Sequence, residues 1–266
     1  MTDYCRPLHL EDALALLADG PRMVLAGGTD LYPAAGAGLG TPVLDISGLA
    51  GMREIEAGEG LRIGGGVTWS EIAAAKLPDA FAGLQQAAVQ IGGRQIQNVG
   101  TVAGNICNAS PAADGVPPLL TLDAQVELAS ASGRRRVPLA DFVLGPRRTA
   151  RATDELVLAL HVPAPAVAGK GVFLKLGARA HLVISIVSVA VRCVTIGGIV
   201  TEITVAVGAC SPVPCRVPAV EAALTGAAVA GLAARVRPED LAALSTARRT
   251  SSVTALVRRA VERAAS

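Results

Sequence analysis

The sequence predicts an α+β fold with two domains, on three observations. Strand-like runs follow one another as hairpins, and helical segments stand in groups between them. That order is typical of α+β proteins and not of a doubly wound parallel sheet. A single stretch of mixed proline, alanine and glycine, residues 163–169, separates the first run of elements from a second. We therefore expect domains over residues 1–167 and 168–266.

Apolar spacing and turn signals give the elements of the first domain. The leucines of residues 9–17 fall on one face of a helix. Thr68 and Glu71 stand in the capping-box pattern that begins a helix, which we expect Pro78 to end. A further helix is expected over residues 81–90. Strands are expected at 23–26, 43–46, 53–57, 61–64, 125–129, 135–138 and 155–162.

The second domain begins with a predicted antiparallel meander. Its strand-like runs are 172–176, 182–196 and 199–207, and the glycine pair at 197–198 is a turn between the last two. The last fifty residues are rich in alanine with helical spacing, most clearly over 253–264. We expect a helix there, packed on the meander.

Composition excludes several classes of function. With 24 basic and 22 acidic residues the net charge is +2, and the aromatic residues are one Trp, two Tyr and three Phe. So little net charge and so few rings argue against a nucleic-acid-binding surface. The 51% apolar and 17% charged fractions argue against a disordered chain.

Targeting signals and cysteine pairs are also missing from the sequence. The longest apolar run, Leu182 to Val191, has half the roughly 20 residues of a membrane-spanning helix and is expected to be a buried strand. Asp3, Glu11 and Asp12 stand where a signal peptide would be apolar. The five cysteines form no CxxC pair, so we expect reduced thiols. These features predict a cytoplasmic protein without a membrane span.

Common catalytic signatures are absent. There is no GxGxxG, no P-loop, no GxSxG and no HExxH, and the histidines at 9, 161 and 181 are scattered. We therefore expect no catalytic side chain and no metal ligands in this chain.

The first glycine-rich segment, residues 25–31, directly follows an apolar run. Its adjacent glycines allow positive φ and leave a row of N–H donors open, which suits an anionic diphosphate. The alternative is an ordinary strand-to-helix turn with Thr29 or Asp30 as N-cap.

The second glycine-rich segment spans residues 95–114. Small and hydrogen-bonding residues fill nearly every position, and long loops without structure are usually functional. The donors around Gly100, Thr101, Gly104 and Asn105 suggest a second phosphate cradle, and Asp114 offers a carboxylate for ribose hydroxyls. A purely structural cluster of turns is the alternative.

Four motifs of the sequence, taken in order, resemble those of a known family. In order, the chain has LAGGTDL, then QIQNVGTVAGNICNASPAAD, then DEL followed by VP, then FLKLGAR. The set resembles the FAD-binding medium subunits of the molybdenum hydroxylases, whose relatives include the medium subunit of carbon monoxide dehydrogenase and the FAD domain of xanthine dehydrogenase. LAGGTDL alone is a weak signal, whereas the ordered set, which spans essentially the whole chain, is very specific.

The resemblance implies a two-lobed FAD-binding domain of the vanillyl-alcohol-oxidase (PCMH) type, with lobes of about 1–52 and 53–167, and a small α+β C-terminal flavoprotein domain with an antiparallel sheet. It also implies the residues around FAD. For the diphosphate these are Leu25, Ala26, Gly27, Gly28, Thr29, Asp30 and Leu31, with Gly100, Thr101, Ala103, Gly104 and Asn105 as a second clamp. For the ribityl and ribose region they are Ser110 and Asp114, and for the flavin or its tail Ile91, Leu156, Val157 and Lys175.

The sequence departs from the family at three places. Ala103 replaces a frequent glycine, so we expect either a negative φ there or a displaced loop. The segment after Arg179 lacks the family's usual acidic residue, and residues 245–254 lack its Tyr-Arg pattern. With no clustered cysteines, we expect no iron–sulfur cluster in this chain.

The resemblance implies an electron-transfer flavoprotein subunit. A large partner subunit would carry the molybdopterin cofactor, and a small one two [2Fe–2S] clusters that pass electrons to FAD here. The complex would be a dimer of heterotrimers, with NAD or oxygen as acceptor. Lys175 would place a positive charge near the isoalloxazine. Two rivals are a stand-alone FAD-dependent oxidase and a non-enzymatic binding module.

Overall fold

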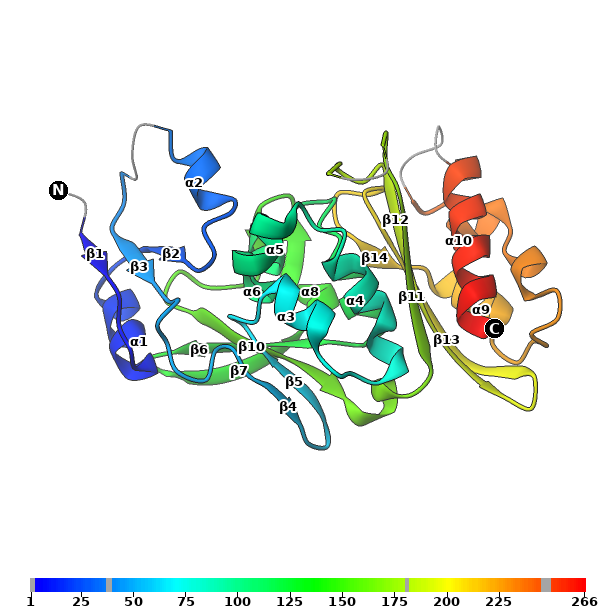
Figure 1. The fold of residues 1–266 in the computed structure, drawn as a ribbon, viewed down its shortest axis with the longest axis horizontal. Coiled ribbons are helices and arrows are strands. Elements are labelled where there is room, and N and C mark those ends of the chain that lie inside the picture. The colour runs from blue at the N-terminus through cyan, green and yellow to red at the C-terminus, as the bar shows by residue number, and fades with distance from the viewer. Residues whose placement is uncertain (1–2, 37–39, 180–181, 245–249) are drawn as a thin grey trace.

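The computed structural model describes residues 3–36, 40–179, 182–244 and 250–266 (Figure 1). The chain begins with a small parallel sheet in the order β1–β3–β2. Its elements are β1 (Tyr4–Cys5), α1 (Leu10–Asp19), β2 (Met23–Leu25), α2 (Leu31–Ala34) and β3 (Val43–Asp45). Helix α1 buries Leu14 and Leu17 in a core that also contains Ala129, Leu156 and Leu158 from the central part of the chain, which confirms the helix expected from the leucine spacing.

A five-stranded antiparallel sheet, in the order β4–β5–β10–β6–β7, forms the base of the central part. Both predicted hairpins are present, with Ile55 opposite Ile63 and Gln125 opposite Pro138. The strands are β4 (Ile55–Ala57), β5 (Gly60–Gly64), β6 (Gln125–Ser130), β7 (Gly133–Pro138) and β10 (Leu156–Pro163); the small pair β8 (Val143–Gly145) and β9 (Arg148–Thr149) precedes β10.

Short helices cover this sheet (Figure 1). They are α3 (Trp69–Ala74), η1 (Asp79–Phe81), α4 (Ala82–Ala88), α5 (Arg94–Val99), α6 (Val102–Asn108), α7 (Val116–Thr121) and α8 (Leu139–Phe142). The capping box of Thr68 and Glu71 is present. The expectation that Pro78 ends α3 was wrong: the helix already ends at Ala74, since Ala75 is extended, and Nε2 of Gln85 donates to carbonyl oxygens of residues 72, 73 and 75 at this end.

The second glycine-rich segment, expected as a long loop, is largely helical. Helix α5 and helix α6 occupy most of residues 94–108 and meet at Gly100 and Thr101. The Gly100 carbonyl accepts from the N–H of Trp69, and the Val102 N–H donates to the Val67 carbonyl. Backbone contacts with residues some thirty positions earlier therefore fix a conformation that the local sequence does not specify.

The C-terminal part is an antiparallel sheet in the order β11–β12–β13–β14 with helices beside it (Figure 1). The strands are β11 (Lys170–Leu176), β12 (Val187–Ile196), β13 (Ile199–Gly208) and β14 (Cys215–Arg216), followed by α9 (Pro218–Leu224), η3 (Leu232–Arg235), η4 (Pro238–Leu241) and α10 (Thr250–Ala265). Valines of β12 and β13 pack with α10 in a core of their own. The α+β class, the antiparallel meander and the final helix are confirmed.

One strand prediction was wrong. Residues 182–186 do not belong to β12, which begins at Val187, and Leu182 and Ile184 are 59% and 79% exposed. The segment folds back instead, because the N–H of Ile186 bonds to Leu176 and the Val183 carbonyl accepts from Lys175. Apolar composition alone does not separate a buried strand from an exposed connection.

The two predicted domains are in close contact. Arg192, 1% exposed, donates to the carbonyls of Thr121 and Ala168, and Thr204 also donates to Thr121. The proline-rich stretch after β10 is not a solvated linker: it forms η2 (Ala164–Val167), and Ala166 is buried in the central core. The division at residues 167/168 stays a prediction.

None of the described helices is long and apolar enough to span a membrane. The five cysteines are free of disulfides, with Cys193 and Cys210 buried. His161 lies on β10 and bonds to Glu127, whereas His181 is outside the described residues.

Candidate cofactor-binding cleft

A cleft of about 750 Å³ lies where the three parts of the chain meet. This volume is within the usual range of small-molecule sites. Every residue predicted to surround FAD lines the cleft except Leu25, whose side chain is buried at the end of β2. Segments far apart in the sequence therefore converge on one site, as the resemblance implied.

The first wall is the loop between β2 and α2, residues 26–30, which we call the glycine loop. A Cβ on Gly27 would lie 1.9 Å from the carbonyl oxygen of Val99. Gly28 has φ of +69°, and a Cβ there would lie 2.4 Å from the Tyr32 ring. Both positions require glycine, because a side chain would collide with α5 or with α2.

The N–H groups of the glycine loop are free. None of the four from Gly27 to Asp30 donates to another residue that the structure describes. Successive backbone N–H groups in a turn form a concavity that binds anions. The alternative of Thr29 or Asp30 as a side-chain N-cap finds no support, since α2 has no side-chain cap bond.

The second wall is the start of α6, and its N–H groups are already used. Val102 and Ala103 donate to carbonyls of residues 67 and 65, while Gly104 and Asn105 donate to Thr101. Thr101 is therefore the N-cap of α6. This wall offers side chains to the cleft rather than the open backbone that we expected.

Asn105 carries an unsatisfied acceptor at this wall. Its Oδ1 is buried without a hydrogen-bond partner among the described residues. The atom is close to Gly115 and to the ring of Trp69, since a Cβ on Gly115 would lie 2.8 Å from it. An unpaired buried oxygen in a cleft is the kind of group that a bound ligand satisfies.

The third wall brings together two predicted residues, Asp114 and Lys175, across the contact between domains. Nζ of Lys175 donates to Asp114 Oδ2 at 2.9 Å and to the carbonyls of Gln90 and Val183 at 3.4 and 3.1 Å. Ser185 donates to the other carboxylate oxygen at 2.6 Å. Both charged side chains are 7% exposed, so all three ammonium donors are used within the protein.

The far wall contains Leu156 and Val157, both buried at the start of β10. Glu155 precedes them, and two bonds from Arg135 at 2.5 and 2.8 Å hold the pKa of its carboxyl below the usual range. Arg151 donates to the Glu155 carbonyl at 2.7 Å. These contacts fix the apolar backbone segment beside the cleft.

Family models match nearly all of the chain. Residues 1–165 match the FAD binding domain in molybdopterin dehydrogenase, and residues 173–264 match the CO dehydrogenase flavoprotein C-terminal domain. The chain belongs to this family. It is the flavoprotein component of a molybdopterin-dependent oxidoreductase, and FAD is its cofactor.

Individual relatives agree with that assignment. The putative xanthine dehydrogenase FAD-binding subunit of Escherichia coli is 34% identical over 80% of this chain and 75% of its own. The nicotinate dehydrogenase FAD-subunit of Eubacterium barkeri is 35% identical over 70% of this chain and 66% of its own.

Solved structures share the fold. The CO dehydrogenase from Oligotropha carboxidovorans superposes with a TM-score of 0.87 at 26% identity, covering 100% of this chain and 98% of that one. Quinoline 2-oxidoreductase from Pseudomonas putida 86, at 22% identity and a TM-score of 0.87 over 100% and 97% of the two chains, shares the fold.

The cleft fits the cofactor of this family. The four free N–H groups suit a diphosphate, and the unpaired Asn105 oxygen suits a hydroxyl donor. Ala103, the departure from the family's glycine, lies inside α6 and so has a helical, negative φ. Its methyl is accommodated by Gly65, where a Cβ would come within 3.1 Å of it.

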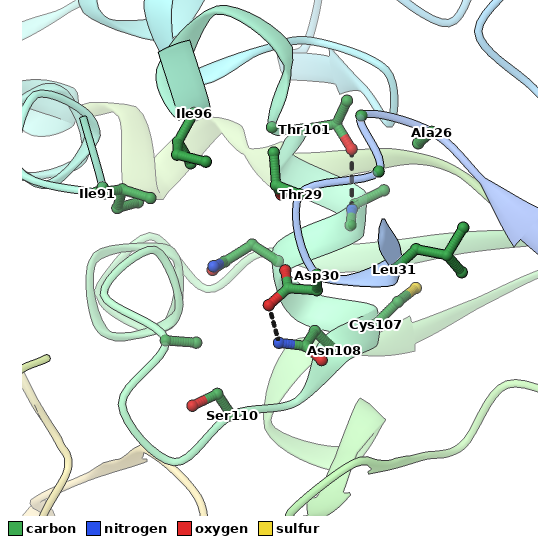
Figure 2. Close-up of a pocket in the computed structure, with 18 of the residues that line it drawn as sticks. Ala26, Thr29, Asp30, Leu31, Ile91, Ile96, Thr101, Cys107, Asn108 and Ser110 are labelled. Atoms are coloured by element: carbon green, nitrogen blue, oxygen red, sulfur yellow. Dashed lines mark hydrogen bonds between the residues drawn. The ribbon is translucent and has the colours of Figure 1, made fainter. Parts of the chain in front are cut away.

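Several cleft residues were not predicted. Cys107 and Asn108 lie within the second glycine-rich segment but were given no role, and others, such as Trp69 and Arg151, stand outside both segments. Burial raises the pKa of the Cys107 thiol to about 11, so it stays protonated at neutral pH. Asn108 donates to Asp30 at 3.0 Å (Figure 2). The other unpredicted lining residues of note are Trp69, Ile96, Arg147, Arg151, Val183 and Ile184.

Proposed function

We propose that the cleft holds FAD with its diphosphate on the free N–H groups of the glycine loop. The single observation behind this proposal is that row of unused donors, from Gly27 to Asp30, facing α6 within a cleft formed by three parts of the chain. FAD, when bound, supplies the redox chemistry, since a flavin exchanges electrons singly or in pairs. The protein binds it and sets its surroundings.

Side chains of the other walls complete the proposed site. Thr101, Asn105 and Ser110 offer hydroxyl and amide groups to the chain of the cofactor. Ile91, Leu156 and Val157 offer apolar contacts. Few aromatic residues line the cleft, so backbone and aliphatic contacts hold the cofactor rather than a pair of stacked rings.

Asp114 and Lys175 have a role in this site that the sequence did not suggest. Because each carboxylate oxygen and each ammonium hydrogen already has a protein partner, the pair primarily ties the second domain to the cleft. The ammonium still contributes a buried positive charge, which favours an anionic form of a nearby group.

We further propose that the chain works in a complex. Relatives are named as medium chains or subunits, including the carbon monoxide dehydrogenase medium chain of Afipia carboxidovorans. A large subunit with the molybdopterin cofactor would oxidise the substrate, and a small subunit with two [2Fe–2S] clusters would deliver electrons to this chain. We propose a dimer of heterotrimers, NAD or oxygen as acceptor, and a cytoplasmic location.

The test is the flavin content of the purified full chain, alone and in its native complex. The chain should be yellow and should release FAD rather than FMN on denaturation. A colourless preparation that FAD does not reconstitute would falsify the proposal. Molybdenum and iron should accompany the native complex, whereas a fully active monomer would support a stand-alone oxidase.

A further inference from the structure

Asp30 and Asn108 join two walls of the cleft. Nδ2 of Asn108, the last residue of α6, donates to Oδ1 of Asp30 in the glycine loop at 3.0 Å, over a separation of 78 residues (Figure 2). We propose that this hydrogen bond, the Asp30–Asn108 clasp, is a positioning device that holds the glycine loop in its FAD-binding conformation. The inference rests on the proposed function and assigns a role to Asn108, which lies in the second motif but was not among the residues expected around FAD.

The carboxylate of Asp30 is not used by its own helix. Asp30 is the N-cap residue of α2, and an aspartate there normally accepts from an N–H of the first turn. No such bond is present in α2. The side chain crosses to α6 instead, so the residue serves a contact between walls rather than a local cap.

The end of α6 is shaped to present Asn108 to the cleft. The next residue, Ala109, has φ of +46° and ψ of +43°, a left-handed conformation that is unfavourable for alanine. The N–H of Arg147 donates to its carbonyl at 3.1 Å, and Ala109 is 1% exposed. Such strain persists only where the surroundings enforce it, and it is common at functional sites.

The clasp is the second of two points that fix the glycine loop. At the other end, Gly27 lies directly against the carbonyl of Val99, close enough that no Cβ fits. The free N–H groups from Gly27 to Asp30 therefore lie between two attachments to α5 and α6. A loop fixed at both ends is ordered before FAD arrives, and preordering strengthens binding because less entropy is lost.

The negative charge of Asp30 allows a decisive test of the proposal. A carboxylate beside a diphosphate repels it, so simple electrostatics predicts that removing Asp30 strengthens FAD binding. The clasp predicts the opposite, because removal frees the loop. Whether removal of the Asp30 carboxylate raises or lowers the affinity for FAD therefore distinguishes the electrostatic expectation from the clasp.

The experiment is a double-mutant cycle on the full-length chain after flavin removal, titrated with FAD. Trp69, the one tryptophan in the sequence, lines the cleft, so quenching of its fluorescence reports binding. Asp30→Ala and Asn108→Ala should each raise the Kd by about tenfold, and the double variant should be no worse than either, since coupled residues are not additive. The exchanged pair, Asp30→Asn with Asn108→Asp, should return the Kd to within about threefold of wild type, because the same two groups again face each other.

Asn98→Ala is the matched control. It removes an exposed side-chain bond, from Ser70 to Asn98 at 2.6 Å, that lies outside the cleft lining, and should leave the Kd unchanged. An unchanged or lower Kd in Asp30→Ala, additive effects in the double variant, or no recovery in the exchanged pair would each overturn the clasp. Failure of wild-type chain to bind FAD would overturn the proposed function instead, so the two failures are distinct.

Discussion

The two glycine-rich segments look alike in sequence and differ in structure. Both were expected to present open backbone to a phosphate. Residues 26–30 do so, with four N–H groups that donate to no residue in the described part of the chain. Residues 95–114 instead contain most of α5 and all of α6, and the first-turn N–H groups of α6 have partners inside the protein.

The glycines have different roles in the two segments. In the glycine loop, Gly27 and Gly28 are required by a backbone contact and a positive φ. In α6, a Cβ on Gly104 would meet only the hydroxyl of Thr101, at 2.9 Å. A glycine-rich stretch therefore indicates a phosphate cradle only where its N–H groups stay free.

Gly27→Ala should have the largest effect. Its new methyl would collide with the Val99 carbonyl, so the glycine loop must move away from α5. We expect FAD affinity to fall by about a hundredfold or more, because a misplaced loop loses several charge-assisted bonds at once. Titration of the flavin-free chain with FAD measures it.

Two alanine substitutions calibrate that result. Gly40→Ala, in open space, should leave affinity unchanged. Gly104→Ala should weaken binding by less than about tenfold, because the helix gains propensity while one hydroxyl shifts. An equal loss of FAD affinity in Gly104→Ala and Gly27→Ala would show that both glycine-rich segments bind FAD through their backbone. The contrast between the two segments would then be wrong.

Thr101→Ala should have an intermediate effect. It removes the N-cap of α6, worth about 1 kcal/mol, which is about 2–4 °C in melting temperature for a chain of this size. It also removes a hydroxyl from the cleft, so FAD affinity should fall by about tenfold. Thr101→Ser should restore both quantities; recovery of stability without recovery of affinity would exclude the hydroxyl as a ligand of FAD.

Glu155→Gln should have the smallest effect of these substitutions. It tests the far wall of the cleft, which neither glycine-rich segment forms. The bonds from Arg135 lower the pKa of Glu155 from its ordinary 4.5, so its stabilising contribution is complete above that pH and is lost as the pH falls through the folded-state value. Wild type should melt about 2 °C higher than the variant at pH 7. The gap should close below pH 4.5, and a gap that persists into acid would show that the charge is not its source.

Local patterns predicted much of the fold correctly. The leucine spacing of α1, the capping box at Thr68 and the hairpin turns all act through residues within a few positions of one another. Such short-range effects can be predicted from a sequence. Side chains three or four residues apart on a helix, or opposite one another across a turn, are in contact however the remainder of the chain folds.

The ordered motifs also identified the family, and every residue that they assigned to the cofactor except Leu25 lines the cleft. The motifs did not give the pairing among those residues. Asp114 and Lys175 were expected at different parts of the cofactor, yet they form one buried ion pair over 61 residues. Residues 182–186 were expected in a strand and instead form a connection before β12, of which Val183 and Ile184 line the cleft.

By itself, then, the sequence determined the α+β class, the order of elements, the family and the chemistry of the cleft lining. The tertiary structure alone decided that most of residues 95–108 are helical, that Lys175 is fully engaged by protein partners, and that Asp30 meets Asn108. The physical reason is the separation along the chain between the residues that interact. Periodicity and capping depend on neighbours along the chain, whereas these contacts depend on how segments far apart in the sequence pack against one another.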